Sequence, residues 1–221
     1  SSNAQRRSMV VVSLLGPDVR IGYTGLIADL DRWERRFDAS AWNIDGHLEQ
    51  SAREMLSRDG RLKFINTDTD ELRAVASDRG DTSVKSQVMT RMGLGKPQFA
   101  VARDNLIAAG RKLGADYLLV IEPGQYKNDP DNRLAGYGLQ QFFGGGHQWF
   151  VATQATLYDT RTQRTLTTHF RSNTNFAGAP ARPLTKTDRY DPETDAEQGV
   201  KMRQTATESL ARTLAAIGLV N

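Results

Sequence analysis

The chain has 221 residues, with 29 lysines and arginines against 26 acidic residues and a formal net charge of +3. A charge balance this small does not give the basic footprint of a nucleic-acid-binding protein. The sequence has no cysteine, which excludes disulfides, thiolate metal sites and cysteine nucleophiles.

The start of the sequence is informative about the cellular compartment of the protein. The start, SSNAQRRS, looks like the remnant of a cleaved expression tag, so we expect residues 1–8 to be a tag scar and a disordered start. Removal of a signal peptide or lipid anchor is one common reason for such a start. No break in composition divides the rest, which favours a single α/β domain over residues 9–221. No apolar run approaches the ~20 residues that span a bilayer.

The first elements are expected to be a hairpin and a short helix. Residues 9–23 contain two β-rich runs separated by Gly16-Pro17-Asp18, a turn cluster that predicts a β-hairpin. Residues 26–42 carry mixed charge with Trp33 and Phe37 four positions apart, which indicates a short amphipathic helix.

Four stretches have apolar residues at helical spacing and are expected to pack one face on a core. They lie at residues 43–59, 67–77, 98–113 and 206–217. Between them, residues 61–67 alternate as a strand does, and residues 79–97 are polar and rich in Gly, Ser and Thr, so a loop is expected there.

The most diagnostic strand pattern is the apolar run at residues 117–121, which predicts a strand buried on both faces at the middle of a sheet. Residues 148–171 then alternate strictly on either side of a turn at 159–163, which predicts an antiparallel hairpin. A long loop is expected at about residues 172–197, which are rich in Pro, Gly and Asp. This element order describes an α/β (α+β) sandwich, with a mixed β-sheet and helices packed mainly on one face.

Three segments carry a family resemblance: HLEQSAREMLSRDGRLKFINTD, LIAAGRKLGADYLLVIEPG and ATLYDTRTQRTLTT. Together they resemble an envelope lipoprotein superfamily that includes the curli-secretion lipoprotein, the lipoprotein activators of penicillin-binding proteins and the amino-terminal domain of the Tol-Pal periplasmic propeller protein. The resemblance covers roughly residues 44–219. It implies an anticodon-binding-domain-like fold and a non-catalytic envelope protein that works by binding other proteins.

Motifs for catalysis are sparse. The glycines at 144–146 lead into a strand, whereas a phosphate cradle needs glycines at set spacing before a helix. No pair of histidines has zinc-ligand spacing, and no Gly-x-Ser-x-Gly motif is present. His47 and His169 are expected to be structural or solvated. The acidic pairs lie in turn-like segments, where caps and solvated loops are the ordinary explanation.

The stretch YGLQQFFGGGHQWF is the main candidate for function. Phe142 and Phe143 have no assigned core partner, and His147 is flanked by aromatic residues. We expect interaction residues at Phe142, Phe143, His147 and Tyr190. An alternative is a small-molecule-binding or enzyme site at Gly144–His147, with His147 as ligand or base beside a carboxylate in a pocket.

The sequence therefore favours a non-catalytic bacterial cell-envelope accessory or scaffold protein over an enzyme. The expected partners are other envelope proteins, with self-association as a second option and no nucleic acid. Membrane contact is expected only through a lipid anchor outside this sequence. No cofactor and no metal are expected. The expected location is the periplasm or the outer membrane, with the cytoplasm as the alternative.

Overall fold

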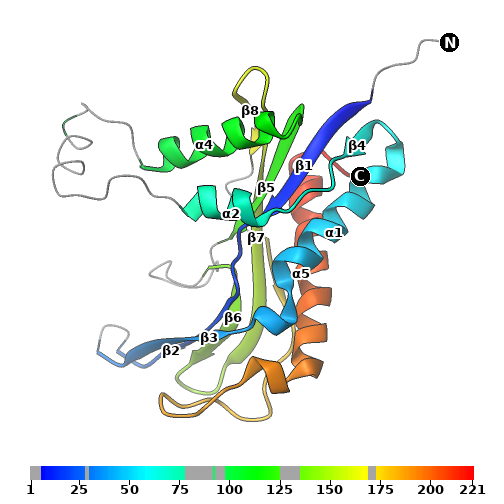
Figure 1. Cartoon of the computed structure of the whole chain (residues 1–221). Helices are drawn as coiled ribbons and strands as arrows, with labels where there is room; N and C mark the ends of the chain where they lie inside the picture. The colour runs from blue at the N-terminus through cyan, green and yellow to red at the C-terminus, as the bar shows by residue number, and fades with distance from the viewer. Residues whose placement is uncertain (1–5, 28–29, 78–91, 93–97, 125–134, 169–172) are drawn as a thin grey trace.

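The computed structural model describes residues 6–27, 30–77, 92, 98–124, 135–168 and 173–221. In this part of the chain nine strands form one mixed sheet, on which four α-helices pack (Figure 1). The strands are β1 (Arg7–Ser13), β2 (Asp18–Thr24), β3 (Arg32–Asp38), β4 (Leu62–Phe64), β5 (Tyr117–Pro123), β6 (Tyr137–Phe142), β7 (His147–Asp159), β8 (Arg164–Thr168) and β9 (Asn173–Phe176). The helices are α1 (Ile44–Leu56), α2 (Asp70–Ser77), α4 (Gln98–Lys112) and α5 (Ala196–Ala216), with the 3-10 turns η1 (Ser40–Trp42), η2 (Ser57–Asp59) and η3 (Pro192–Thr194).

The long strand β7 joins two halves of the sheet. On one edge, residues 153–159 of β7 pair with β5 and residues 147–151 pair with β6, both antiparallel. On the other edge, residues 156–159 pair with β8 and residues 150–153 with β9. Strands β1 and β4 extend the sheet beyond β5, and β2 and β3 extend it beyond β6; β1 is parallel to β5 and β2 is parallel to β6. The sheet therefore has an upper half, β4-β1-β5-β7-β8, and a lower half, β3-β2-β6-β7-β9 (Figure 1).

Glycines lie at the junctions between the halves. Gly124 donates its N–H to Ala152 O at 2.8 Å, and Gly136 donates to Gly124 O at 2.9 Å, so β5 and β6 follow one another along the same edge of β7. Within β6, a Cβ on Gly138 would lie 2.0 Å from the backbone oxygen of Arg20, so only glycine allows β2 to approach this closely.

The two faces of the sheet carry different helices. Alternate residues of β1 and β5 point to one core with α1 and α5, and the intervening residues point to a second core with α2 and α4. The first core also fills the lower half of the sheet, where Trp42 and Trp149 are buried. The predicted α/β sandwich with a mixed sheet is therefore confirmed, with α1 and α5 on one face of the sheet and α2 and α4 on the other.

Most elements with a clear period are confirmed. Helices α1, α2, α4 and α5 lie where apolar spacing placed them, and β5 lies between β1 and β7 with both faces buried. The β7–β8 pair is the predicted antiparallel hairpin. The expected loop at residues 79–97 lies outside the described residues, apart from Met92, as do residues 1–5. Strand β1 begins at Arg7, earlier than expected.

Four expectations are corrected. Residues 9–23 form two strands but no hairpin, because β1 and β2 pair with different neighbours in different halves of the sheet. The helix expected within residues 26–42 is the strand β3, which forms a hairpin with β2 and is followed by the single turn η1. Residues 134–148, which we expected to be a loop that contacts a partner, contain the strand β6. The expected loop at 172–197 contains β9, η3 and the start of α5.

Candidate functional site

The lower end of the sheet consists of two hairpin tips that lie side by side. The described residues of the β2–β3 tip are 25–27 and 30–31, and the β6–β7 tip spans Phe143 to Gly146. Parallel pairing joins β2 to β6 as far as Thr24 and Phe142. One more hydrogen bond extends this ladder, since the Phe143 N–H donates to Thr24 O at 3.0 Å. The two tips therefore form one continuous end of the molecule.

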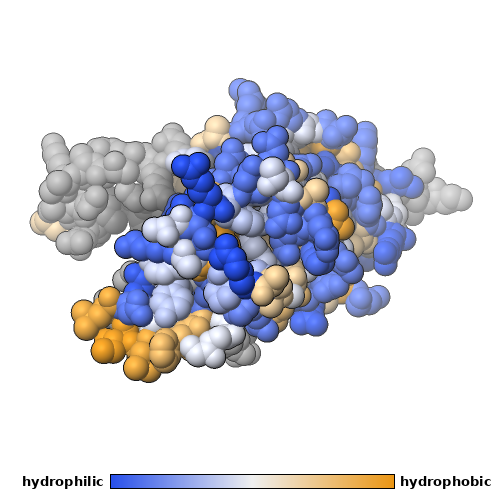
Figure 2. Space-filling view, turned by 90° about the horizontal axis from the view of Figure 1, so that it is seen from below, coloured by the Kyte–Doolittle hydropathy of each residue, from blue (hydrophilic) through white to orange (hydrophobic). Residues whose placement is uncertain are grey.

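Four large apolar side chains project from these tips into solvent. The exposed fractions are 77% for Leu26, 58% for Ile27, 83% for Leu30 and 61% for Phe143. In Figure 2, an apolar patch gathers at this end of the molecule, on a surface that is otherwise largely polar. Single exposed apolar residues are ordinary, but a contiguous patch on a soluble protein indicates a binding surface. We call these four residues the tip surface.

The three glycines set the shape of the β6–β7 tip. Gly144 and Gly145 have φ of +90° and +102°, a region that side chains with a Cβ rarely adopt. The turn closes where Phe142 N–H donates to Gly146 O at 2.7 Å and Gly145 N–H to Phe142 O at 3.2 Å. A Cβ on Gly144 or Gly145 would meet no atom within 4 Å, so these glycines serve backbone conformation and not close packing. The chain leaves this turn into β7, as the sequence indicated.

Behind the tips, a long segment crosses the lower half of the sheet on the α1 and α5 side. We call residues 177–191 the strap. It starts beside β7, where Ala177 N–H donates to Trp149 O at 2.8 Å. It is held over β6 by the amide of Gln141, which donates to Leu184 O at 3.0 Å and accepts from Leu184 N–H at 2.7 Å. At β3, the guanidinium of Arg35 donates to its Asp188 carbonyl oxygen.

Tyr190, a predicted interaction residue, lies at the inner side of the strap. Its ring centroid is 5.6 Å from that of Trp149 and 6.4 Å from that of Trp42, and its hydroxyl donates to Asp195 at 2.9 Å. Burial and the neighbouring carboxylate raise the pKa of Tyr190 well above that of a free tyrosine. The structure gives this residue an evident packing role, and its part in interaction stays a prediction.

The other three predicted residues occupy one hairpin but not one face. Phe143 is part of the tip surface. Phe142 is half-buried and packs on the small cluster of Phe150 and Ala152, on the opposite face of the sheet from Tyr190. His147 opens β7 opposite Gln141 and is partly buried. The structure thus separates Phe142 from Tyr190, and of the four predicted residues it leaves Phe143 as the one that is largely exposed.

A shallow hollow of about 330 Å³ lies beside this hairpin. Its described lining is Phe142, Gly145–Gln148, Gly178 and Ala179, which includes His147 but no acidic side chain. The alternative of a small-molecule or enzyme site called for a carboxylate near His147, and none is among those lining residues. Elsewhere, the His47 ring nitrogen lies 2.8 Å from Thr207 Oγ1, and burial lowers the pKa of His47. His169 lies outside the described residues.

Leu26, Ile27 and Leu30 were not among the residues predicted to interact. They were assigned to an amphipathic helix, whose apolar side chains are expected to be buried. The available signal was Gly25, which comes directly after the β-branched and aromatic run of β2 and is a common hairpin-turn residue. Gly25 at this position predicts a hairpin whose turn is apolar.

A buried polar cluster lies at the end of β1, away from the tips. The Glu49 carboxylate, almost fully buried, accepts from Ser13 N–H at 3.0 Å, from Thr69 Oγ1 at 3.1 Å and from Arg73 Nη2 at 2.6 Å. Arg73 also donates to Asp70 at 2.6 Å. This cluster ties α1, α2 and β1 together, and the Glu49 carboxylate at its centre has several partners, which is the pattern of a structural network.

The described residues contain neither a cluster that could hold a metal ion nor a helix that could span a membrane. No group of three or more histidine, cysteine or acidic side chains there is arranged to hold a metal ion. In the same part of the chain, no helix has both the length and the apolar character required to cross a membrane.

No family model and no curated protein matches the chain. Matches among solved structures include the PelC dodecamer from Paraburkholderia phytofirmans, at 12% identity and a TM-score of 0.35 over 98% of this chain and 92% of that one. The C-terminal domain of LpoB from Salmonella enterica is 13% identical, with a TM-score of 0.29 over 78% of this chain and 86% of its own. Lipoprotein GNA1162 from Neisseria meningitidis is 13% identical, with a TM-score of 0.32 over 90% of this chain and 96% of its own. At these identities and TM-scores, the matches imply nothing about the partners or activity of this chain.

Proposed function

We propose that this protein is a non-catalytic accessory or scaffold protein of the bacterial cell envelope, and that it acts by binding another protein through the tip surface. Residues 9–221 would act as one α/β domain in the periplasm or anchored at the outer membrane. The envelope compartment is supported by the sequence resemblance over residues 44–219. The mode of action is supported by the structure of the tips.

The observation that carries the proposal is the exposure of Leu26, Ile27, Leu30 and Phe143 on adjacent tips. Full burial of one such side chain stabilises by about 1.5–3 kcal/mol. Four largely exposed side chains therefore offer roughly 5 kcal/mol or more towards association, before the cost of lost freedom is subtracted. A convex apolar end of this kind fits a partner with a complementary apolar groove.

The tips are also held in place before any partner arrives. The Gly25 N–H donates to Asp31 O at 2.6 Å, which closes the β2–β3 tip, and the Phe143 N–H fixes the second tip to the first. Behind them, the Tyr23 and Trp33 rings stack with centroids 5.9 Å apart. A surface that is ordered in advance loses less conformational entropy on binding.

The test is cross-linking in cells that express the full-length native gene. A photo-reactive residue at Ile27 should trap a specific envelope protein, and one at the exposed Val200 of α5 should not. The variant Leu26→Ser/Leu30→Ser/Phe143→Ser should lose the cross-link and keep its fold, because its side chains lie in solvent. The matched control Val200→Ser should keep it. Equal trapping from Ile27 and Val200, or trapping that survives the triple substitution, would refute the tip surface as the binding site.

The compartment is tested separately by fractionation of the same cells. We expect the native gene product in the periplasmic or outer-membrane fraction, and recovery in the cytoplasm alone would contradict the envelope assignment.

A further inference from the structure

The charged side chains along the outer edge of β3 are complementary to the same strand in the antiparallel orientation. Strand β3 ends the path of the sheet, and in the described chain it pairs only with β2. Its sequence is RWERRFD, and the exposed residues along it include Glu34, Arg36 and Asp38. Natural edge strands usually carry charge to prevent pairing with other chains. The order of positive and negative side chains along β3 instead favours pairing with one particular kind of strand.

The hydrogen bonds to β2 show which backbone groups of β3 face outward. Gly25 N–H donates to Asp31 O and Ala39 N–H donates to Pro17 O, both within the β2–β3 ladder register. In an antiparallel ladder, the N–H and C=O groups of successive residues point alternately towards the neighbouring strand and away from it. The odd-numbered residues of β3 therefore bond β2. The even-numbered residues, from Arg32 to Asp38, present their N–H and C=O groups to the free edge.

We propose that β3 pairs with β3 of a second copy of this chain, antiparallel and with the two-fold axis at Arg35. In that register, the outward-facing residues meet as Arg32 with Asp38 and as Glu34 with Arg36, each twice. Opposite charges therefore face one another at every hydrogen-bonded pair, on the side of the sheet away from the strap. On the strap side, Trp33 faces Phe37, an aromatic cross-strand pair.

Neighbouring registers do not match. An axis at Glu34 sets Arg32 against Arg36, and an axis at Arg36 sets Glu34 against Asp38, so both bring like charges together. A shift by a single residue would oppose outward-facing groups to inward-facing ones and is excluded by the ladder geometry. The one like-charged pair in the proposed register is Arg35 with itself. Each Arg35 guanidinium is already held by the Asp188 carbonyl and lies 4.6 Å from the centroid of its own Phe37 ring.

Three of the four charged residues in this pairing, Glu34, Arg36 and Asp38, are exposed, and Arg32 is partly buried. Asp38 accepts hydrogen bonds from the backbone and the side chain of Ser40, which lower the pKa of Asp38, so its carboxylate is ionised at neutral pH. Glu34 and Arg36 lie on the same side of the strand, with Arg36 Nε 3.5 Å from Glu34 Oε1.

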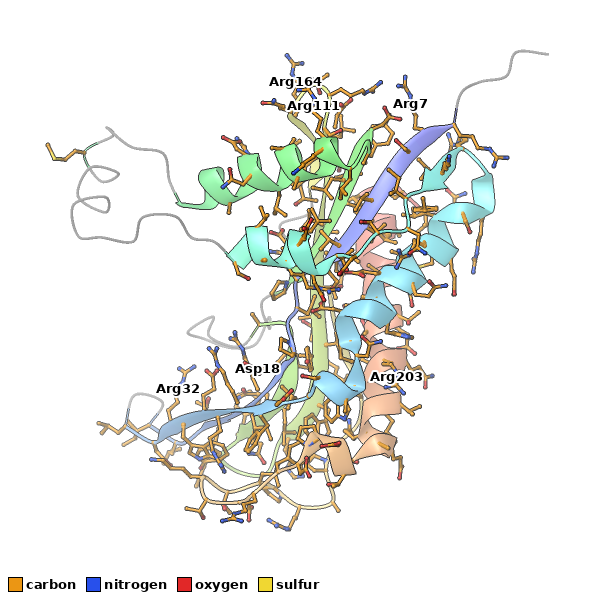
Figure 3. All side chains as sticks on the ribbon, viewed as in Figure 1. Arg7, Asp18, Arg32, Arg111, Arg164 and Arg203 are labelled. Atoms are coloured by element: carbon orange, nitrogen blue, oxygen red, sulfur yellow. The ribbon has the colours of Figure 1, made fainter. Side chains whose placement is uncertain are left out.

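The geometry of the hairpin gives the pair its shape. Arg32 lies near the tip of the β2–β3 hairpin, and Asp18 lies at its other end (Figure 3). An antiparallel pair about Arg35 places the two tips at opposite ends of a continuous sheet. The tip surfaces therefore do not meet, and the inference does not rest on the function proposed for them.

Cysteine cross-linking tests the axis without background, because the full chain has no cysteine. Arg35→Cys places two thiols at a non-hydrogen-bonded pair, with Cα atoms about 4.5 Å apart, which is within disulfide range. Asp38→Cys on the same strand places its two thiols about 20 Å apart, given ~3.4 Å per residue. Mild oxidation should link Arg35→Cys and leave Asp38→Cys unlinked. Equal linking of both variants overturns the register.

Charge exchange tests the pairing by a second route, with the dissociation constant measured by analytical ultracentrifugation. Glu34→Arg creates two Arg–Arg contacts per dimer, and Arg36→Glu creates two Glu–Glu contacts, so each should weaken the dimer roughly tenfold or more. The double variant Glu34→Arg/Arg36→Glu should restore it. An equimolar mixture of the two single variants should form heterodimers, because every contact then joins opposite charges.

The outcomes separate this pairing from other kinds of self-association. Circular dichroism and the unfolding midpoint establish that each variant keeps its fold. A wild-type protein that stays monomeric, or a dimer indifferent to both single charge reversals, overturns the proposal. So does a dimer that dissociates on Leu30→Ser but tolerates Glu34→Arg, since that dimer would be held by the tips.

Discussion

Replacement of Glu49 tests whether the buried cluster at the end of β1 holds α1, α2 and the sheet together. Glu49→Ala leaves the N–H of the fully buried Ser13 without its acceptor, which costs about 1–3 kcal/mol. It also removes the acceptor of the Thr69 hydroxyl and a partner of Arg73. Arg73 is the least affected, because its side chain is 27% exposed and keeps Asp70. We therefore expect a total loss of about 3–4 kcal/mol, towards the lower end of what breaking a buried pair costs.

Glu49→Gln is the matched control. The amide oxygen can still accept from Ser13 and Arg73, and the amide nitrogen can donate to the Thr69 hydroxyl, which is free to rotate. Only the charge is lost, so the expected cost is about 1 kcal/mol. Guanidinium unfolding followed by tryptophan fluorescence measures both variants, and thermal unfolding should show a fall in Tm of roughly 10 °C for the alanine variant. An alanine variant within about 1 kcal/mol of wild type, or equal losses for both substitutions, would refute the account of the cluster.

Three further substitutions test other parts of the structure. Gln141→Ala removes the two hydrogen bonds to Leu184 and should cost about 2 kcal/mol and speed limited proteolysis within the strap; unchanged cleavage would show that the strap is held otherwise. Burial raises the pKa of Glu122, so the folded state is penalised as pH rises above the ordinary carboxyl range, and Glu122→Gln should stabilise the protein at pH 7 but not at pH 4. A gain that is equal at both pH values would contradict this. Gly145→Ala should cost about 1 kcal/mol through its positive φ alone, whereas Gly146→Ala, whose Cβ would meet Phe142 at an ordinary 3.7 Å, should cost less in the same unfolding assay.

The elements that the sequence predicted correctly are those whose burial leaves an unambiguous period. The run at 117–121 is apolar on both faces because β5 lies between two strands and two helix layers, and the stripe on α5 faces a single core. The strand β3 was mistaken for a helix for a physical reason. Trp33 and Phe37 are four residues apart, and residues at that spacing share a face in a strand as well as in a helix.

The remaining errors arise where polar contacts replace apolar burial or where topology is decided at long range. Strand β6 was missed because Gln140 and Gln141 are buried, and Gln141 is satisfied only by the strap more than forty residues away. The turn Gly16-Pro17-Asp18 has the residues of a chain reversal. Here it displaces the chain from the upper half of the sheet to the lower half, and no local residue distinguishes these two outcomes.

The pairing of the first strands with much later ones also determines when the protein can fold. Met9 of β1 pairs with Tyr117, and Arg20 of β2 pairs with Gly138, so each strand has one partner more than a hundred residues downstream. The last helix, α5, supplies much of the core beneath both halves of the sheet. Closure of such long loops is slow, and strands that wait are exposed to aggregation. A nascent chain that emerges from the ribosome therefore cannot complete this sheet and its core until its final helix has been made.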